Sequence, residues 1–381
     1  MNNIIPFGKP IIGNEEYESI KKVLESGILV HGEKTKEFEK EFANRVGSEF
    51  AISVSSCTAG LHLALFCSGI KEGDKVAVPA MTHVATAHVV ELSGATPIFI
   101  DVEKETGNMD IEKLFIASKE HDLNAIIPVH YLGLPCNMDK INEIAKSNNS
   151  LVIEDCALAM DAKYGSLKAG NLGDCASFSF YPVKHMTSVE GGMVTTNNPN
   201  LAELIKKKKA FGYNKSLGER SRPGQYDVDQ LGFNYRMNEI EAAVGLCQLE
   251  RLDKNLKIRE RNYKILYNKL KDLDKVNLFP NYCDKSFSSY YCFNLVLSEN
   301  CSLDRDLVQD HLKNVGIGSS IHYPSAVPLF TYYSEKYFYK KGDFPISEWL
   351  GARTISLPVG PHIDEDQINY LANKTYEILT R

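Results

Sequence analysis

The chain has no long hydrophobic run, since no apolar stretch approaches the roughly 18 residues that a membrane-spanning helix needs. Its first residues, MNNIIPFGKP, show neither the basic nor the apolar segment of a secretory signal. Its nine cysteines are scattered and form no C-x-x-C pair, which argues against a zinc site or a disulfide framework. These absences lead us to expect a cytoplasmic protein with reduced thiols, no metal site and no membrane partner.

The chain also has no excess of positively charged residues. The chain carries 43 Lys and Arg residues against 49 Asp and Glu residues, which gives a formal net charge of −6. This balance argues against nucleic acid as a partner. Backbone N–H groups can still hold a phosphate locally, so a phosphorylated ligand remains compatible with the composition.

Between about residues 50 and 195, short β-rich runs alternate with helical patterns, and several of these runs are continuously apolar. Strands that helices bury on both faces have this character. The predicted strands are 50–54, 76–79, 96–100, 125–129, 151–153, 176–182 and 191–197, and the predicted helices between them are 59–69, 82–92, 110–119 and 138–146. The pattern predicts an α/β fold with a mostly parallel central sheet flanked by helices.

The 381 residues are enough for one large and one smaller domain. After a long helical stretch that runs to about residue 271, the remaining chain mixes strands and helices. We therefore expect a large α/β domain over residues 1–250 and a small C-terminal α+β domain over residues 251–381.

Two segments carry small or acidic residues where a strand ends. Residues 55–60, SSCTAG, open a predicted helix, so that free backbone N–H groups could approach an anion there, although small residues serve a structural cap equally well. Glu154 and Asp155 follow an apolar strand. A carboxylate at that edge could hold a metal, bond a ribose, pair with a protonated ring nitrogen or cap the next helix.

A third segment, SFYPVKHMTSVEGG at residues 179–192, places Lys184 between two predicted strands. A lysine that forms a Schiff base needs an uncharged amine, and therefore a desolvated site. A surface lysine in a turn would give the same pattern. His185 faces away from such a site if the segment is extended, so we expect it to pack in the core.

Taken in order, these motifs resemble the DegT/DnrJ/StrS family of sugar aminotransferases. The resemblance runs from about residue 5 to residue 375 and rests on T-A at 58–59, E-D at 154–155, S-F-x-x-x-K at 179–184, E-G-G at 190–192 and G-F-N-Y-R-M at 232–237. It implies a fold-type-I enzyme with pyridoxal 5'-phosphate as cofactor, in which residues 1–250 form the cofactor-binding domain.

The resemblance also implies a role for each matching residue. Lys184 would form the Schiff base and move the proton, and Asp155 would pair with the ring nitrogen. Asn234 would reach the cofactor phosphate of a neighbouring subunit, so that a homodimer shares its active sites. The implied cofactor-binding residues are Cys57, Thr58, Ala59, His83, Asp155, Ser179, Lys184 and Asn234, and the implied substrate-binding residues are His322 and Tyr323.

Three positions depart from the family pattern. His83 stands where an aromatic residue usually stacks on the cofactor ring, and histidine adds a titratable group there. Leu158 stands where a polar residue commonly bonds the ring oxygen, and Cys57 stands where glycine is frequent. None of them changes the lysine, so they leave the reaction class intact and put the acceptor substrate in doubt.

The reaction that the resemblance implies moves an amino group from L-glutamate to the ketone of a nucleotide-linked keto-deoxysugar, as in polysaccharide biosynthesis. A small phosphorylated ketone such as dihydroxyacetone phosphate is the alternative acceptor. A sugar 3-dehydratase is disfavoured, because such relatives carry histidine at the position of Lys184. A cofactor-binding regulatory protein is disfavoured too, because it would be expected to lose that lysine or to gain a DNA-binding module. No G-x-G-x-x-G follows the first strand, which disfavours a nicotinamide dehydrogenase.

Overall fold

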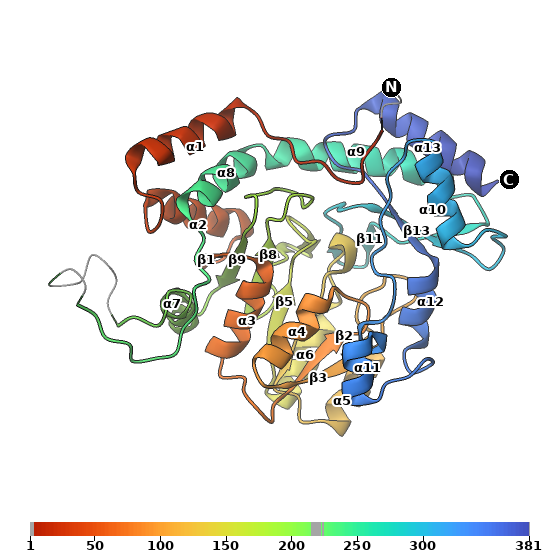
Figure 1. The fold of residues 1–381 in the computed structure, drawn as a ribbon. Coiled ribbons are helices and arrows are strands. Elements are labelled where there is room, and N and C mark those ends of the chain that lie inside the picture. Colours follow the sequence, from red (N-terminus) through yellow and green to blue (C-terminus); the bar gives the residue numbers. More distant parts are fainter. Residues whose placement is uncertain (1–3, 215–221, 223–224, 381) are drawn as a thin grey trace.

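A seven-stranded sheet forms the centre of the large body in the computed structural model, which describes residues 4–214, 222 and 225–380 (Figure 1). Its strand order is β1-β9-β8-β5-β4-β2-β3. The strands are β1 (Phe50–Val54), β2 (Lys75–Pro79), β3 (Thr96–Ile100), β4 (Ala125–Ile126), β5 (Leu151–Asp155), β8 (Cys175–Ser179) and β9 (Gly192–Thr196). Strand β9 runs antiparallel to both neighbours, and the pairs among the other strands are parallel. The predicted α/β fold with a mostly parallel sheet is therefore confirmed.

Helices cover both faces of this sheet. They are α1 (Asn14–Ser26), α2 (Glu33–Val46), α3 (Cys57–Cys67), α4 (Val84–Leu92), α5 (Ile111–Glu120), α6 (Met138–Asn148), α7 (Pro199–Lys208) and α8 (Glu239–Glu250). Alternate residues of one strand enter different cores, as the pleat requires. In β1, Ile52 packs in the core under α3, α4 and α7, whereas Ala51 packs in the core under α2 and α8.

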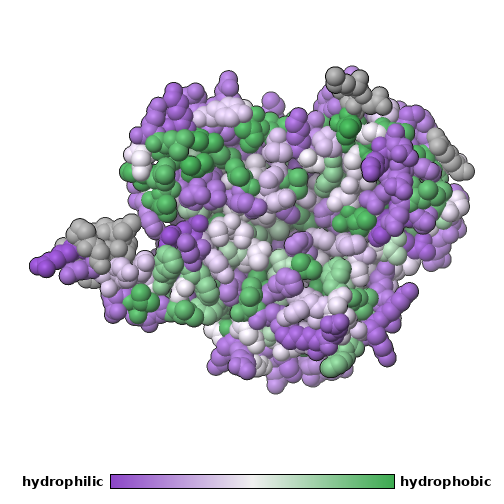
Figure 2. Space-filling model, viewed as in Figure 1, coloured by the Kyte–Doolittle hydropathy of each residue, from purple (hydrophilic) through white to green (hydrophobic). Residues whose placement is uncertain are grey.

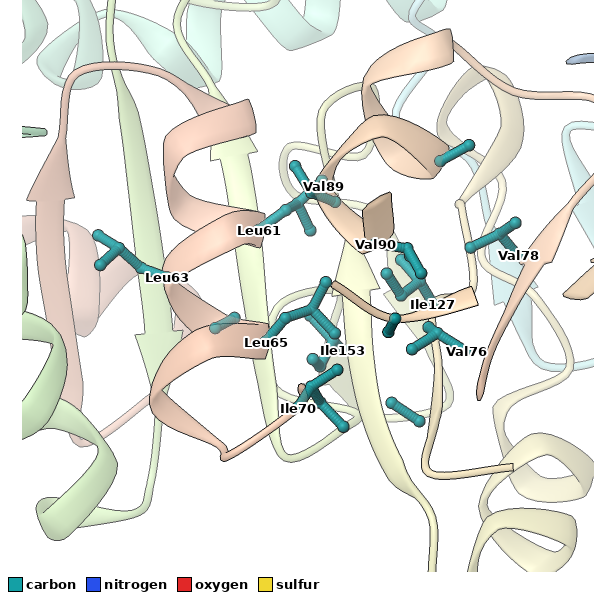
Figure 3. Packing of buried hydrophobic residues seen from close by; sticks show 14 of the residues in the cluster. Leu61, Leu63, Leu65, Ile70, Val76, Val78, Val89, Val90, Ile127 and Ile153 are labelled. Carbon is teal, nitrogen blue, oxygen red and sulfur yellow. The ribbon is translucent and has the colours of Figure 1, made fainter. Parts of the chain in front are cut away.

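The core under α3 and α4 is built from aliphatic side chains that meet between helix and sheet (Figure 3). Leu61 and Leu65 of α3, Val89 and Val90 of α4, and Ile153 of β5 are all buried there. Because α3 is apolar on nearly every side, it fits only between the sheet and neighbouring helices. This packing holds the first turn of α3 in a fixed place above the sheet.

The C-terminal part contains the long helix α9 (Leu252–Leu270) and a three-stranded sheet in the order β10-β13-β14. Its remaining larger elements are β10 (Val276–Leu278), β13 (Phe293–Leu297), α10 (Arg305–Asn314), α11 (Thr331–Tyr337), α12 (Pro345–Arg353), β14 (Thr354–Leu357) and α13 (Glu365–Leu379). A smaller sheet, in the order β11-β12-β6-β7, is formed by β6 (Lys163–Tyr164), β7 (Leu167–Lys168), β11 (Tyr282–Cys283) and β12 (Ser286–Phe287). None of the helices in the described ranges is both long and apolar enough to cross a bilayer.

Segments near the two ends of the chain each pack in the opposite part of the molecule, which we call the large lobe (the seven-stranded sheet and its helices) and the C-terminal lobe (the three-stranded sheet and its helices). Ile5 bridges to Ile317 and is buried in the C-terminal core. In the other direction, Val327 and Phe344 are buried in the core of the large sheet. Buried Asp101, just after β3, fixes this returning segment, because its carboxylate accepts the Ser347 N–H (2.9 Å) and hydroxyl (2.6 Å). The division at residue 250 stays a prediction.

Candidate active site

All the predicted cofactor residues except Asn234 meet at the carboxyl edge of the large sheet. Asp155 ends β5, Ser179 ends β8, residues 57–59 open α3 after β1, and His83 follows β2 just before α4. Lys184 lies in the connection from β8 to β9. In open α/β sheets this edge is where ligands bind.

Lys184 is held so that its amine gives up its proton more readily than a solvent-exposed lysine does. Burial lowers the pKa of this amine, and the nearby Cys57 and Asp155 oppose that shift without cancelling it. The Nζ atom lies 5.3 Å from the centroid of the Tyr291 ring. An uncharged amine can attack a carbonyl carbon and can later accept a proton, which is what the Schiff-base role requires.

Asp155 is a buried carboxylate whose hydrogen-bond donors are neutral. Its Oδ2 accepts the Thr86 hydroxyl (2.9 Å) and its Oδ1 accepts the Ala157 N–H (3.1 Å). A carboxylate has about four acceptor positions, so two remain for another donor. A buried carboxylate is stabilised by a cationic partner. The site therefore fits the protonated ring nitrogen of pyridoxal phosphate, while the bond from the Ala157 N–H shows that Asp155 also orders the turn after β5.

The first turn of α3 supplies an anion site. The Ser56 hydroxyl caps the helix by accepting the Ala59 N–H (3.0 Å), and the Ser177 hydroxyl of β8 bonds the Cys57 carbonyl (3.0 Å). Gly60 lets the helix approach β8, since a Cβ there would lie 2.3 Å from the Ser177 Oγ. The N–H groups of the first turn have no acceptor within the helix, which suits a phosphate.

Gly192, the last glycine of the E-G-G motif, packs directly against the first turn of α3. Replacing it tests whether this turn binds the cofactor phosphate. A Cβ at Gly192 would lie 2.5 Å from the Ser56 carbonyl carbon and 2.6 Å from the Cys57 nitrogen, both of them backbone atoms. Gly192→Ala must push the α3 turn outward, at about 1–3 kcal/mol. We expect pyridoxal phosphate affinity to fall about tenfold or more in an absorbance titration.

Gly13→Ala is the matched control. A Cβ at Gly13 meets mainly the end of the flexible Glu15 side chain, at 2.7 Å from its Oε2. This variant should keep cofactor affinity within about twofold. Equal affinities in wild type and Gly192→Ala would show that the turn does not hold the phosphate.

His83 and Leu158, two of the departures, occupy different surroundings. The His83 Nδ1 accepts the Ala85 N–H (3.2 Å), which leaves the proton on Nε2. Burial, and then the neighbouring Lys184, lower the pKa of His83, which favours the neutral ring. Leu158 is buried in an apolar cluster, and only its carbonyl makes a polar contact, with the Ser289 hydroxyl (3.0 Å).

His322 and Tyr323 lie beside the lysine although they come from the C-terminal part. The His322 Nδ1 lies 3.0 Å from the Ser356 Oγ, and that hydroxyl donates to the Asn294 Oδ1 (2.8 Å). His322 Nδ1 is therefore the donor, and Nε2 keeps its lone pair. Burial, and then the charge of Lys184, lower the pKa of His322 to about 3. The Tyr323 ring centroid lies 6.1 Å from that of His83.

Glu154 stabilises the fold, and its carboxylate bonds groups outside the Lys184 site. Its carboxylate accepts the His130 Nε2–H (2.9 Å), and it accepts the N–H groups of Gly170 (2.9 Å) and Leu172 (2.8 Å). Both Glu154 and His130 are fully buried. Glu154 thus anchors the loop before β8, and the two halves of the E-D motif have separate tasks. His185 is also buried, with its Nε2 bonded to the Ser289 carbonyl (2.9 Å), as predicted.

Asn234 is exposed and is not joined to the Lys184 group by any hydrogen bond among the described residues. Its backbone bridges to Ala210, and the next residue, Tyr235, accepts the Ser55 N–H (2.8 Å). Asn234 therefore lies close to the end of α7, since the following residue, Tyr235, also donates its N–H to the Lys209 carbonyl (2.9 Å).

Sequence reasoning missed three residues that support the site. Thr86 bonds Asp155, Tyr291 faces the amine, and Arg259 of α9 donates to the Lys184 carbonyl (3.2 Å). Each comes from a different part of the chain and has no local motif. Only the tertiary fold brings them to the lysine.

A lysine of lowered pKa, a buried carboxylate with no ion-pair partner among the described residues and a helix N-terminus lie on one sheet edge, which are the features of a pyridoxal-phosphate enzyme of the aminotransferase class. The comparisons agree with this assignment: the model of the DegT/DnrJ/EryC1/StrS aminotransferase family matches residues 10–375. The chain belongs to this family of sugar aminotransferases.

Three relatives illustrate the match. An uncharacterized protein of Methanocaldococcus jannaschii is 37% identical over 99% of this chain and 98% of its own. The spore coat polysaccharide biosynthesis protein SpsC of Bacillus subtilis is 35% identical over 99% of this chain and 98% of its own. The putative sugar aminotransferase Spr1654 from Streptococcus pneumoniae, solved in its PMP-form, has a TM-score of 0.92 and 26% identity, covering 99% of each chain.

Proposed function

We propose that the enzyme moves an amino group from L-glutamate to the ketone of a nucleotide-linked keto-deoxysugar in polysaccharide biosynthesis. The observation that carries this proposal is the arrangement of Lys184, Asp155 and the α3 N-terminus described above. The similarity to a spore coat polysaccharide biosynthesis protein supports a sugar acceptor.

Pyridoxal phosphate, when bound, supplies the carbonyl group and the electron sink for amino transfer. Lys184 holds the cofactor and then accepts and returns the proton at the reacting carbon. Asp155 keeps the ring nitrogen protonated. Residues 57–59 and Ser179 would hold the phosphate, and His83 would contact the ring.

On the acceptor side, His322 offers an unprotonated Nε2. A neutral imidazole nitrogen accepts a hydrogen bond from a hydroxyl group, and sugars present several. Tyr323 adds an aromatic surface next to His83. We infer that these two residues orient the sugar.

We also infer a homodimer in which Asn234 of one subunit reaches the phosphate of the other. The exposure of Asn234 supports this arrangement. Apolar side chains also gather on the surface over α1 and α2 (Figure 2), where Leu24 and Ile28 are 55% and 57% exposed. Exposed apolar patches mark protein interfaces.

The proposed donor and acceptor are tested by absorbance. L-Glutamate should move the band of the purified enzyme from about 420 nm to about 330 nm, as the cofactor passes from its pyridoxal to its pyridoxamine form. A nucleotide-linked keto-deoxysugar should restore the first band, whereas dihydroxyacetone phosphate should not. A band that glutamate does not move contradicts the donor, and restoration by the phosphorylated ketone alone contradicts the sugar acceptor.

A further inference from the structure

A small cavity lies next to Lys184, where the N-terminal segment meets α9 and the segment before α13. Its volume is about 20 Å³, and its lining includes Phe7, Lys9, Lys184, Arg259, Tyr291 and His362. A space of this size holds one water molecule or one monatomic ion. It is too small for an amino acid, a phosphate or a sugar.

Arg259 lines this cavity with a buried guanidinium whose hydrogen-bond partners include no carboxylate. Only 5% of the residue is exposed. Its Nη1 donates to the Tyr291 carbonyl (2.8 Å) and its Nη2 to the Lys184 carbonyl (3.2 Å), both neutral acceptors. Its Nε has no hydrogen-bond partner among the residues that the structure describes. A guanidinium has five N–H groups, so three are left unused.

The other polar groups of the lining add no compensating charge. Lys9 is cationic, and His362 donates its Nε2–H to the Pro6 carbonyl (3.0 Å). No Asp or Glu from the described part of the chain lines the cavity. Burial lowers the pKa of Arg259 to about 10, which still leaves it charged at neutral pH. The cavity is therefore a site of positive potential.

We propose that this cavity binds a monovalent inorganic anion of the halide class, held by the free N–H groups of Arg259. A buried charge is expensive unless a partner of opposite sign compensates it. A halide meets both requirements, because it carries the missing charge and fits the volume. Arg259 bonds the main-chain carbonyl of Lys184 and not its amine, so the proposed anion is held by a group that the amino-transfer chemistry does not use.

Arg251 shows the contrasting case within the same region of the chain. Its guanidinium pairs with the carboxylate of buried Glu16, and Gln248 donates to the same carboxylate (2.7 Å). Because Arg251 already has its counter-charge, it needs no added anion. It is therefore the matched control for Arg259.

The direct test is crystallographic and uses the wild-type holoenzyme with sodium bromide as the probe. Crystals grown or soaked in bromide should show one anomalous peak within hydrogen-bonding distance of the Arg259 guanidinium. A water without anomalous signal, or an empty cavity, overturns the proposal. This measurement needs no variant, so it decides the question even if changes at Arg259 prevent folding.

The solution test compares thermal melting in sodium chloride and in sodium gluconate of equal ionic strength, because gluconate is too large to enter. At a chloride concentration roughly a hundredfold above Kd, the wild-type Tm should rise by about 3 °C more than in gluconate. Arg259→Met should lose this difference, and Arg251→Met should keep it. A difference that survives in Arg259→Met overturns the proposal.

Discussion

Replacing Lys184 with alanine should abolish amino transfer, with turnover lower by at least about 10⁴-fold. The variant loses both the group that holds the cofactor and the base that moves the proton. The measurement is single-turnover absorbance with L-glutamate, in which the shift from about 420 nm to about 330 nm should disappear.

The same substitution should leave the fold intact, because of the direction of its pKa shift. A lysine whose folded-state pKa is lowered disfavours folding by an amount that is full below the folded-state pKa and falls to zero as the pH rises to the unfolded-state pKa. Removing Lys184 therefore takes away a cost at neutral pH, and the Tm of the cofactor-free protein should stay equal to that of the cofactor-free wild type or rise. Lys285→Ala, which removes an exposed lysine paired with Asp139, should keep both Tm and turnover. Full activity in Lys184→Ala would refute the role of this lysine.

Replacing Asp155 with alanine should slow both half-reactions by roughly 10²- to 10³-fold. The carboxylate that keeps the ring nitrogen protonated is lost, so the cofactor becomes a weaker electron sink. Stopped-flow absorbance with glutamate measures the first half-reaction, and the return of the band with acceptor measures the second.

The neighbouring carboxylate provides an informative contrast. Glu154→Gln should lower stability by about 2–4 kcal/mol, because Glu154 accepts buried N–H groups and the buried His130. Its turnover per folded molecule should stay within a few-fold of wild type. If Glu154→Gln slowed the chemistry while Asp155→Ala only lowered Tm, the assignment of the two residues would be reversed.

The fold was largely predictable because its strands are apolar runs and its helices have regular periods. Where boundaries differ, local hydrogen bonds explain the difference. Helix α3 begins at Cys57 and not at residue 59, because Ser56 caps it. Helix α4 begins at Val84 and not at residue 82, because the preceding His83 caps it, a role that histidine seldom takes. The strand predicted at 125–129 ends at Ile126.

The site was predictable only as far as local motifs reach. The residues at the strand ends were found because each lies in a short characteristic segment, and their individual roles remain predictions. Arg259 could not be found, since it is one of several basic residues on an amphipathic helix, and its burial depends on the segment from Phe7 to Lys9 lying over it. Thr86 could not be found either, because nothing in the sequence distinguishes it from any other threonine in the first turn of a helix.

The crossing of the two chain ends sets the order in which this protein can mature during synthesis. The core of the large sheet contains Phe344, so it cannot close until nearly nine-tenths of the chain has left the ribosome. The C-terminal core includes Ile5, which is made first and stays unburied until the late residues of that core, up to Leu379, have been made. The lobes therefore finish folding together and late, and the partly made chain exposes apolar surface for most of its synthesis.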